Sequence, residues 1–525
     1  MPFIDSLRAL SSGNLPYPLS TPLEKPLPYI ITVLLLLAAY LAQGESNKGK
    51  GDFPIANPKK PFEFTYFKRV KEFQDAPREH FAKYRDLYPE TPYWINTELG
   101  KALTLPSSMI NEIRVNPNMS SLAAIQEIQN GSLKGFEPIG DVLDEEMLKL
   151  VKEHLTTKNL GKMTQAVSAE VSEALQDIFS DSQEWKEFLI GEPIVHLVAR
   201  PSSRVFGGKT FCRSTAWLEA MADYTKHFLY ASIALRFFPK WSKSLVQWVL
   251  PPCISLRKDL EVCRKVIKPI IEQRQAEMEA AAQSGAEVEY AFDQAFGTLK
   301  REVDMATAHI ALAMVAIHTT ADLLMKTLVA LIEHPEFVEP LRQEVIREIG
   351  ATGLNNAGLA RLDLMDSVLK EVQRRNPVAN CFLNRIALND LHMSNGMVIP
   401  KGTLCGVGPT HMWDNGFYEN GDKFDGYRFL RMREDPAKRQ QSFFVSTSPE
   451  HLGFGHGSHS CPGRFFASNE VKILLSHLLL KYDWKLPEGA KPNIINWGVL
   501  NAVHPETKLL LRRRREELDL DSLAV

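Results

Sequence analysis

The amino-acid sequence predicts a mostly α-helical protein with small β-sheets, preceded by one membrane anchor helix. Three observations support this fold class. Helical patterns of apolar residues dominate residues 144–350, and strand-like segments elsewhere are few and short. Residues 26–44 contain no charged side chain and are long enough to cross a membrane. The sequence therefore predicts a short anchor followed by one large helical domain.

Composition argues against several classes of protein. The 525 residues include 61 basic and 63 acidic side chains, and this near-neutral balance argues against a nucleic-acid partner. The six cysteines form no C-x-x-C pair, which argues against a disulfide framework or a zinc ribbon and predicts a reducing compartment. Length alone would suggest about three domains of roughly 150 residues, but large single-domain enzymes exceed that size.

Residues 26–44 are predicted to cross a membrane once, because a helix of this length spans about 30 Å of hydrocarbon. A buried core helix and a cleaved signal peptide are the alternatives. Residues 1–25 carry charges of both signs, which is unusual for a signal peptide. Most flanking basic residues follow the stretch, at Lys48, Lys50, Lys59 and Lys60. We therefore expect residues 1–25 to be lumenal and the rest of the chain to be cytosolic.

Residues 45–61 are predicted to be a stiff linker, because Pro54, Pro58 and Pro61 favour extended backbone. Residues 62–525 then form one domain, in which the sequence contains no internal repeat.

The longest helix of that domain is predicted over Thr298–Glu333, a run without Gly or Pro that ends before Pro335. Its middle, Ala306–Ile317, is almost wholly apolar, so the helix should cross the interior. Strands are predicted at Ala102–Leu105, Asn384–Ala387, Met397–Pro400 and Thr507–Leu511. The Arg512–Arg515 run after the last strand is expected to be a solvated tail.

The segment from Phe454 to Arg464 carries the strongest chemical signal. Gly457 and Gly463 flank Cys461 and allow backbone N–H groups to approach its sulfur, and a helix is predicted to start just after it. The positive end of that helix lowers the pKa of a thiol, and Phe454 shields the sulfur from water. These features suit a thiolate ligand at Cys461, although for a lone cysteine an inert, buried thiol is the simpler interpretation.

Two other interpretations of this segment remain open. The first is a glycine-rich loop around an inert, buried cysteine. The second is a zinc site made of His456, His459 and Cys461. Neither alternative explains the fixed spacing of Phe, Gly, Cys and Gly.

Phe454, Gly457, Cys461 and Gly463 match the F-x-x-G-x-x-x-C-x-G haem-binding signature, so the chain resembles the cytochrome P-450 superfamily. The resemblance covers roughly residues 62–515. It implies the cytochrome P-450 fold, a single haem domain, and haem b (iron protoporphyrin IX) as cofactor. Cys461 is then the axial ligand of the haem iron, which favours O–O bond cleavage.

Two further segments resemble family motifs near the haem. Glu371 and Arg374 form an E-x-x-R, whose spacing places opposite charges on one helix face. Phe424–Phe429 resembles the P-E-R-F segment, with Gly426 and Tyr427 replacing Pro and Glu. Arg428 is retained, and the family pattern implies a buried structural triad of Glu371, Arg374 and Arg428.

The long helix contains Val315–Thr320, which resembles the A-G-x-D/E-T-T oxygen-binding segment. Thr319 aligns with the threonine that orients oxygen and its protons, and Ala316 leaves space over the iron. His318 replaces the usual acidic residue, and it is either part of a proton relay or a packed histidine. Thr319 is also expected to bond back to a preceding carbonyl, which bends the helix and opens a pocket.

Further positions follow from the resemblance. His459 and Arg385 occupy positions that often contact the haem propionates. The substrate pocket is expected to be lined by Met305, His309, Ala313 and Ala316, by Val378–Leu383 and by Trp497–Val503. Most of these side chains are apolar, which suits a bulky hydrophobic substrate.

The resemblance therefore implies a haem-thiolate monooxygenase that uses O2 to oxidise, most simply to hydroxylate, a hydrophobic metabolite. The anchor, the linker and the Ala316–Thr320 segment resemble fungal endoplasmic-reticulum members that act on terpenoids, indole diterpenes or meroterpenoids. A separate NADPH-cytochrome P-450 reductase is the expected partner, because the sequence contains no flavin-sized unit or G-x-G-x-x-G after a strand. Desaturation, ring rearrangement and oxidative coupling are alternative reactions, and a membrane haem-binding scaffold is the non-enzyme alternative.

Overall fold

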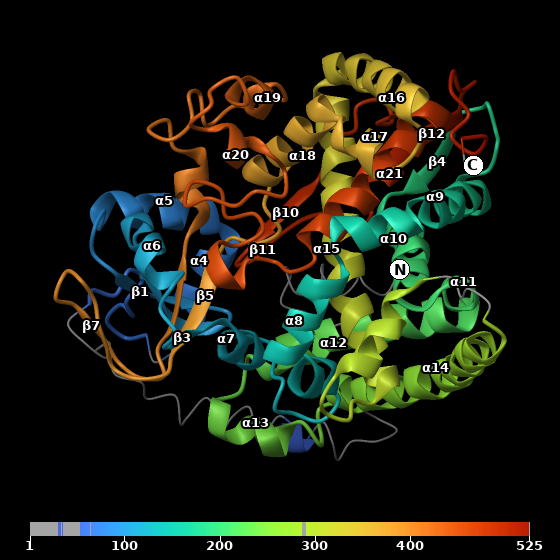
Figure 1. The fold of residues 1–525 in the computed structure, drawn as a ribbon. Coiled ribbons are helices and arrows are strands. Elements are labelled where there is room, and N and C mark those ends of the chain that lie inside the picture. Colours follow the sequence, from blue (N-terminus) through green and yellow to red (C-terminus); the bar gives the residue numbers. More distant parts are fainter. Residues whose placement is uncertain (1–29, 33, 35–52, 64, 286–289, 524–525) are drawn as a thin grey trace.

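The computed structural model describes residues 30–32, 34, 53–63, 65–285 and 290–523. Helices make up most of the molecule, and most strands gather on one side of it (Figure 1). Residues 1–29, most of the predicted anchor and residues 45–52 of the predicted linker lie outside the described ranges, so the anchor stays a prediction. Of the helices described, α15 alone is long and apolar enough to cross a bilayer. Its apolar stretch is mostly buried inside the protein.

The helices are α4 (Phe67–Asp75), α5 (Pro77–Leu87), α6 (Ile110–Ile113), α7 (Ser121–Ile128), α8 (Glu145–His154), α9 (Thr157–Phe179), α10 (Gly191–Gly207), α11 (Lys209–Cys212), α12 (Thr215–Leu235), α13 (Lys240–Val246), α14 (Pro251–Ser284), α15 (Met305–Glu333), α16 (Val338–Thr352), α17 (Asn356–Ala360), α18 (Asp363–Arg375), α19 (Arg428–Met432), α20 (Arg439–Ser442) and α21 (Arg464–Lys481). Short helical turns include η2 (Pro138–Val142), η3 (Phe292–Thr298), η5 (Pro409–Trp413) and η6 (Gly457–His459). The mostly helical fold class is confirmed.

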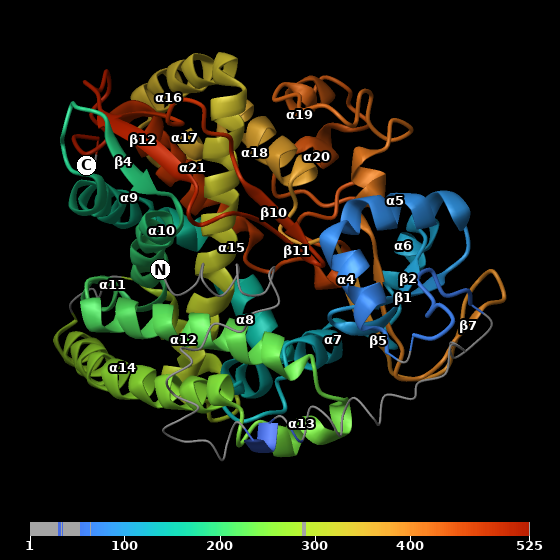
Figure 2. The same ribbon diagram turned by 180° about the vertical axis from the view of Figure 1, so that it is seen from behind.

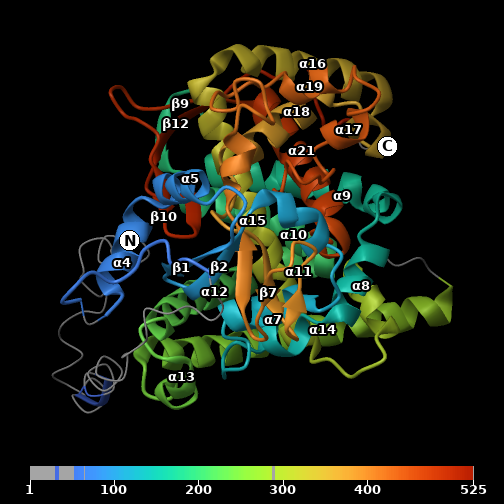
Figure 3. The same ribbon diagram turned by 90° about the vertical axis from the view of Figure 1, so that its left-hand side faces the viewer.

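Helix α15 passes through the centre of the molecule, as predicted for the apolar run (Figure 3). Its start was predicted wrongly, because the helix begins at Met305 and not at Thr298. Asp304 caps it by accepting a hydrogen bond from the backbone N–H of Thr307 at 3.3 Å. Thr298 belongs to the separate turn η3.

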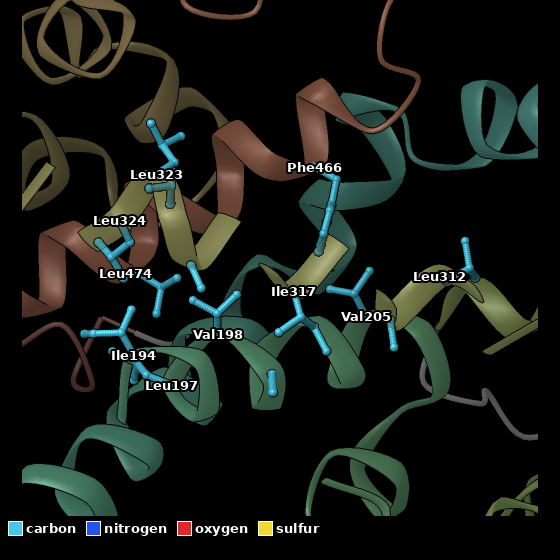
Figure 4. Packing of buried hydrophobic residues seen from close by; sticks show 14 of the residues in the cluster. Ile194, Leu197, Val198, Val205, Leu312, Ile317, Leu323, Leu324, Phe466 and Leu474 are labelled. Atoms are coloured by element: carbon cyan, nitrogen blue, oxygen red, sulfur yellow. The ribbon is translucent and has the colours of Figure 1, made fainter. Parts of the chain in front are cut away.

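The main hydrophobic core surrounds α15. Side chains of α10, α15 and α21 meet there, and Phe466 of α21 lies close to Ile317 of α15 and Val205 of α10 (Figure 4). All three side chains are less than 5% exposed. Since α21 begins three residues after Cys461, this packing fixes the cysteine segment relative to α15.

The largest sheet has the strand order β1-β2-β8-β5-β3. Its strands are β1 (Tyr93–Thr97), β2 (Gly100–Leu105), β3 (Met119–Ser120), β5 (Phe382–Ala387) and β8 (Leu404–Val407). The pair β2–β8 is parallel and the other pairs are antiparallel. Register shifts between Phe382 and Arg385, where Leu383 has a φ of 51°, so Arg385 follows a bulge in β5.

Three smaller sheets complete the described strands. They are β4 (Lys186–Leu189), β12 (Lys508–Arg513) and β9 (Tyr482–Lys485); β10 (Ile494–Trp497) with β11 (Leu500–Val503); and β6 (Leu391–His392) with β7 (Val398–Ile399). Each strand predicted from the sequence overlaps an observed one. Viewed from behind, β10 and β11 lie between the largest sheet and the helices (Figure 2).

Two predictions at the ends of the domain were wrong. The described part of the linker is not a free spacer, because Ile55 pairs with Trp94 and Asn57 is buried against β1. The arginine run is not a solvated tail, because β12 continues through Arg513 and Arg514 pairs with Glu517 at 2.6 Å. Backbone pairing holds both segments against the domain, together with a buried hydrogen bond at Asn57 and an ion pair at Arg514.

Candidate active site around Cys461 and helix α15

Cys461 lies in a tight loop between η6 and α21. Its backbone N–H donates to the carbonyl of Phe454 at 2.8 Å, which closes the loop. Gly457 has a φ of 82°, and a Cβ there would lie 2.9 Å from the Cβ of Arg114. Glycine is therefore required by both conformation and space. The thiol itself is free and half-buried.

Opposing effects act on the Cys461 thiol. Burial raises its pKa, whereas the backbone amide of Gly463, the Arg464 guanidinium and the Arg464 amide lower it. These donors lie at the start of α21, as the sequence predicted. They suit a sulfur that carries negative charge.

Contacts from distant parts of the chain hold this loop, and sequence reasoning missed them. Lys152 of α8 donates its Nζ to the carbonyl of Ser458 at 2.9 Å. His456 Nδ1 lies 3.0 Å from Thr447 Oγ1. The Lys152–Ser458 bond has no sequence signature, because the two residues are 306 positions apart, whereas Thr447 and His456 are separated by 9 positions but belong to no motif.

The structure argues against the zinc alternative for His456, His459 and Cys461. Within the ranges that the structure describes, no three His, Cys, Asp or Glu side chains are placed to hold a metal ion. His456 is instead directed at Thr447, and η6 separates it from Cys461 along the backbone.

The structure brings Glu371, Arg374 and Arg428 together in the interior. Glu371 accepts two hydrogen bonds of 2.8 Å from Arg374 and one of 3.1 Å from Arg428 Nε. The remaining guanidinium N–H groups donate to backbone carbonyls: Met412, Glu419, Asn420, Gly421 and Lys423. The triad therefore fastens η5 and the segment around residues 419–425 to α18.

One face of α15 is open in the middle of the domain. Val315 is 42% exposed and Thr319 is also exposed, although most of the helix is buried. Ala316 is half-buried between them. An exposed face on a central helix means that a cavity adjoins it. Thr319 Oγ1 donates to the carbonyl of Val315 at 2.9 Å and approaches that of Ala316 at 3.3 Å, the back-bonding that the sequence predicted.

His318 lies on a different side of α15 from the open face. It lines a small cavity of about 20 Å³ with Trp217 of α12 and His196 of α10, and neither Val315 nor Thr319 borders that cavity. Burial lowers the pKa of His318 to about 4, so its imidazole is neutral at physiological pH. This position fits a packed histidine, and the proton-relay role stays a hypothesis.

Two segments predicted to line the substrate pocket are joined to each other. Val378 is 40% exposed, and the next residue, Ala379, pairs with Leu500 of β11. Asn380 donates its side-chain amide to the carbonyl of Gly498 at 2.9 Å. The predicted set on α15 is divided, because Met305 and His309 border another cavity and Ala313 is 1% exposed.

The residues around Cys461 fit a haem. Arg385 is 3% exposed, yet its Nε and Nη2 have no hydrogen-bond partner in the described structure. Burial lowers the pKa of His459, and so does the positive charge of Arg385. Because such a charge acts only over a short distance, His459 and Arg385, the two residues predicted to contact the propionates, lie near each other. Among the described residues, a Cβ added at Gly463 would meet no atom within 4 Å apart from those of its chain neighbours. The unpaired donors of Arg385, the open space beside Gly463 and the N–H donors of Gly463 and Arg464 near the sulfur match an anionic, thiolate-ligated group.

Comparisons with known proteins agree with this geometry. A family model described as cytochrome P450 matches residues 144–511. The chain is 38% identical over 512 residues to cytochrome P450 monooxygenase eqxH of Fusarium heterosporum, which covers 96% of this chain and 99% of that protein. It is 36% identical to cytochrome P450 monooxygenase TRI1 of Fusarium sporotrichioides over 89% of this chain and 86% of that one. The crystal structure of cytochrome P450DA heme domain shares the fold, with a TM-score of 0.67 at 18% identity over 88% of this chain and 98% of that one.

Proposed function

This chain belongs to the cytochrome P450 family and is a monooxygenase, and from that premise we propose that it hydroxylates a bulky, hydrophobic metabolite of the terpenoid, indole-diterpene or meroterpenoid class. One observation carries the proposal. The open face of α15 presents Val315 and Ala316 beside the hydroxyl of Thr319. An apolar wall with one polar group suits a hydrophobic skeleton that is oxidised at one position.

The residues that would hold the haem are those around Cys461. Cys461 Sγ would ligate the iron, and Arg385 and His459 would contact the propionates. When bound, the haem supplies an iron centre at which O2 is reduced, and thiolate ligation favours O–O cleavage. Phe454 shields the sulfur side, where it packs against Phe444 with ring centroids 5.1 Å apart.

Thr319 is proposed to hold and pass protons. Its Oγ1 donates to the Val315 carbonyl, and therefore its lone pairs remain to accept a hydrogen bond from a water molecule in the cavity. A hydroxyl group that both accepts and donates hydrogen bonds can hold this water molecule next to the position where O2 would react. Val315 and Val378 exclude other water, since both are apolar.

We propose that a separate NADPH-cytochrome P-450 reductase supplies the electrons. The residues that match the family form a haem domain, so electron transfer falls to a partner. Arg464 is near the thiolate, with its Nη1 2.9 Å from the Cys461 carbonyl, and it marks the face where the reductase would dock.

We further propose that the protein is held on the endoplasmic reticulum by residues 26–44, with the haem domain in the cytosol. A surface near α13 supports membrane contact: Phe237, Trp241, Leu245 and Trp248 are 44% to 69% exposed. Described residues of the predicted anchor, drawn in blue, lie at the same lower end of the molecule as α13 (Figure 2). Carbonate extraction of microsomes tests the anchor. The full chain should stay in the pellet, and release of the full chain would contradict membrane insertion.

The decisive experiment is microsomal expression with a reductase and a panel of terpenoid and indole-diterpene intermediates, followed by mass spectrometry. A gain of one oxygen atom supports hydroxylation, whereas loss of two hydrogens indicates desaturation.

The reduced carbon-monoxide spectrum tests whether Cys461 ligates the haem iron. Cys461→Ala should remove the long-wavelength Soret band of a thiolate-ligated haem, and Cys263→Ala, at a buried free cysteine of α14, should retain it. Loss of all oxidation with the band intact would favour the scaffold alternative.

Thr319→Ala tests the proton role. We expect oxygen consumption to continue while product per oxygen falls by about a hundredfold, the lower end of the range for a proton-transfer group. Thr327→Ala is a matched control, because Thr327 makes the same back-bond, to the Leu323 carbonyl at 2.8 Å, but is fully buried. Equal coupling in both variants would remove Thr319 from this role.

A further inference from the structure

A second cavity lies beside the first part of α15, at a distance from the open face around Thr319. It measures about 300 Å³ and is lined by residues of α10, α14, η3, α15 and the short α11. Of these elements, α11 and α14 lie on the lower right of the molecule, while α15 runs through its centre (Figure 1). Met305 and His309 border it from α15, since positions four residues apart share a helix face.

This cavity is separate from the candidate active site. Neither Val315, Ala316 nor Thr319 borders it. His309 precedes Thr319 by ten residues, which corresponds to roughly 15 Å along a helix. No residue of the Cys461 loop, 454–464, lines the cavity. Whatever the cavity binds is therefore not held for oxidation at the haem.

The walls of the cavity are largely apolar and partly aromatic. Phe211 and Phe296 flank the His309 ring, with centroids 4.8 Å and 5.3 Å away. Ile270 and Met305 extend the apolar lining. Such walls favour a compact, apolar ligand.

Two buried polar atoms in this lining lack partners. Asp293 is 6% exposed, and its Oδ2 accepts from Arg274 Nε at 3.0 Å while its Oδ1 has no hydrogen bond in the described structure. His309 is 2% exposed, and its Nδ1 is likewise unpaired there. Buried polar atoms are nearly always hydrogen-bonded, so two such atoms on residues that line one cavity point to a polar group that the described residues do not supply.

The charges restrict the chemistry of that ligand. Arg274 already balances the carboxylate of Asp293, so a neutral hydrogen-bond donor suits Oδ1 better than a second cation. Burial lowers the pKa of His309 to about 3, and a neutral imidazole can accept from or donate to a hydroxyl.

We propose that the cavity between α14, η3 and α15 is a second small-molecule site, for a compact, neutral, hydroxylated apolar ligand that donates to Asp293 Oδ1 and bonds His309. Its size is at the lower limit for small-molecule sites, about 300 Å³. The inference does not depend on which metabolite is oxidised.

The test uses the haem-loaded enzyme and 4-(trifluoromethyl)phenol, a neutral aromatic alcohol, observed by fluorine NMR. Because this probe can also enter the haem pocket, Val315→Trp serves as the background that fills the open face of α15. Saturable binding should persist in Val315→Trp. Adding His309→Phe, which keeps the aromatic packing, should weaken it about tenfold, the effect of losing one buried hydrogen bond.

Filling the cavity provides the second arm. Met305→Trp, or Ile270→Trp from α14, should abolish the remaining binding while the haem spectrum stays intact. Trifluoromethylbenzene, which lacks the hydroxyl, should bind about tenfold more weakly than the phenol in the Val315→Trp background. Binding that disappears in Val315→Trp, or that survives both cavity-filling variants, would overturn the proposal.

Discussion

Two buried arginines eleven residues apart have opposite surroundings. Arg374 on α18 is fully buried, and its guanidinium donates to Glu371 and to the carbonyls of Met412, Gly421 and Lys423. Arg385 on β5 is 3% exposed, and one N–H of its guanidinium donates to the Asn384 carbonyl at 2.9 Å, while Nε and Nη2 are unpaired in the described structure. The chain completes the first site by itself and leaves the second incomplete.

The difference separates residues that hold the fold from residues that await a ligand. A buried charge without partners costs several kcal/mol, about 3 to 5 when a partner is removed. A fold tolerates such a charge where a bound group supplies the partner. Arg385 beside the Cys461 loop fits this description, and Asp293 and His309 fit it in the second cavity.

The largest expected effect comes from breaking the complete site. Glu371→Gln removes the carboxylate between Arg374 and Arg428 without changing its shape, and it leaves two buried cations unbalanced. The free energy of unfolding should fall by about 3–5 kcal/mol, as measured by urea unfolding with circular dichroism.

The control for this variant is an exposed pair of the same type. Lys71 and Asp75 are 3.2 Å apart, and their side chains are about half exposed. Asp75→Asn should cost less than about 1 kcal/mol, since exposed ion pairs contribute little. Similar losses in Glu371→Gln and Asp75→Asn would show that the triad does not stabilise the fold.

Local patterns in the sequence predicted much of this architecture. The spacing of Glu371 and Arg374 on one helix turn, the apolar run of α15 and the glycines around Cys461 act over a few residues, so a sequence shows them directly. Arg428 was predicted as a member of the triad only from the family resemblance. The carbonyls of residues 412–423 and the bond from Lys152 to Ser458 were not predicted, because they depend on how distant segments pack.

Two errors have local causes. The start of α15 was placed at Thr298 because that run lacks Gly and Pro, but the Asp304 cap decides where the helix begins. Met305 and His309 were assigned to the substrate pocket with Ala316 because they lie on the same helix face. Positions along one face are up to roughly 16 Å apart, so they border different cavities.

A buried carboxyl group on α21 is intermediate between the fully paired Arg374 and the mostly unpaired Arg385. Glu470 is 1% exposed, accepts from Ser202 Oγ at 2.7 Å and has an unpaired Oε2. Burial raises its pKa from 4.5 to about 8, so the folded protein holds a proton that the unfolded chain loses at lower pH. The stability gained from that proton is fully present below about pH 4.5 and is lost as pH rises through about 8.

Glu470→Gln, an isostere of the protonated acid, should remove this dependence. Between pH 5 and 8, the unfolding free energy of the unmodified protein should fall relative to the variant by about 1 kcal/mol per pH unit. Chemical unfolding at a series of pH values measures the difference. Glu279→Gln, on the exposed part of α14, should leave the slope unchanged. A constant difference between the two proteins would mean that Glu470 is already ionised in the folded state.

The smallest effect on folding is expected at the incomplete site. Arg385→Leu removes a guanidinium that the chain barely satisfies. Relief of the unpaired buried charge should offset the packing that is lost, so the free energy of unfolding of the haem-free protein should fall by less than about 1 kcal/mol. Haem transfer to excess apomyoglobin should nevertheless become several-fold faster, because a propionate loses its partner. Arg385→Lys keeps the charge and should be intermediate in haem transfer. A stability loss as large as that of Glu371→Gln, with unchanged haem transfer, would mean that Arg385 is a structural residue and that unpaired buried donors do not mark ligand sites in this protein.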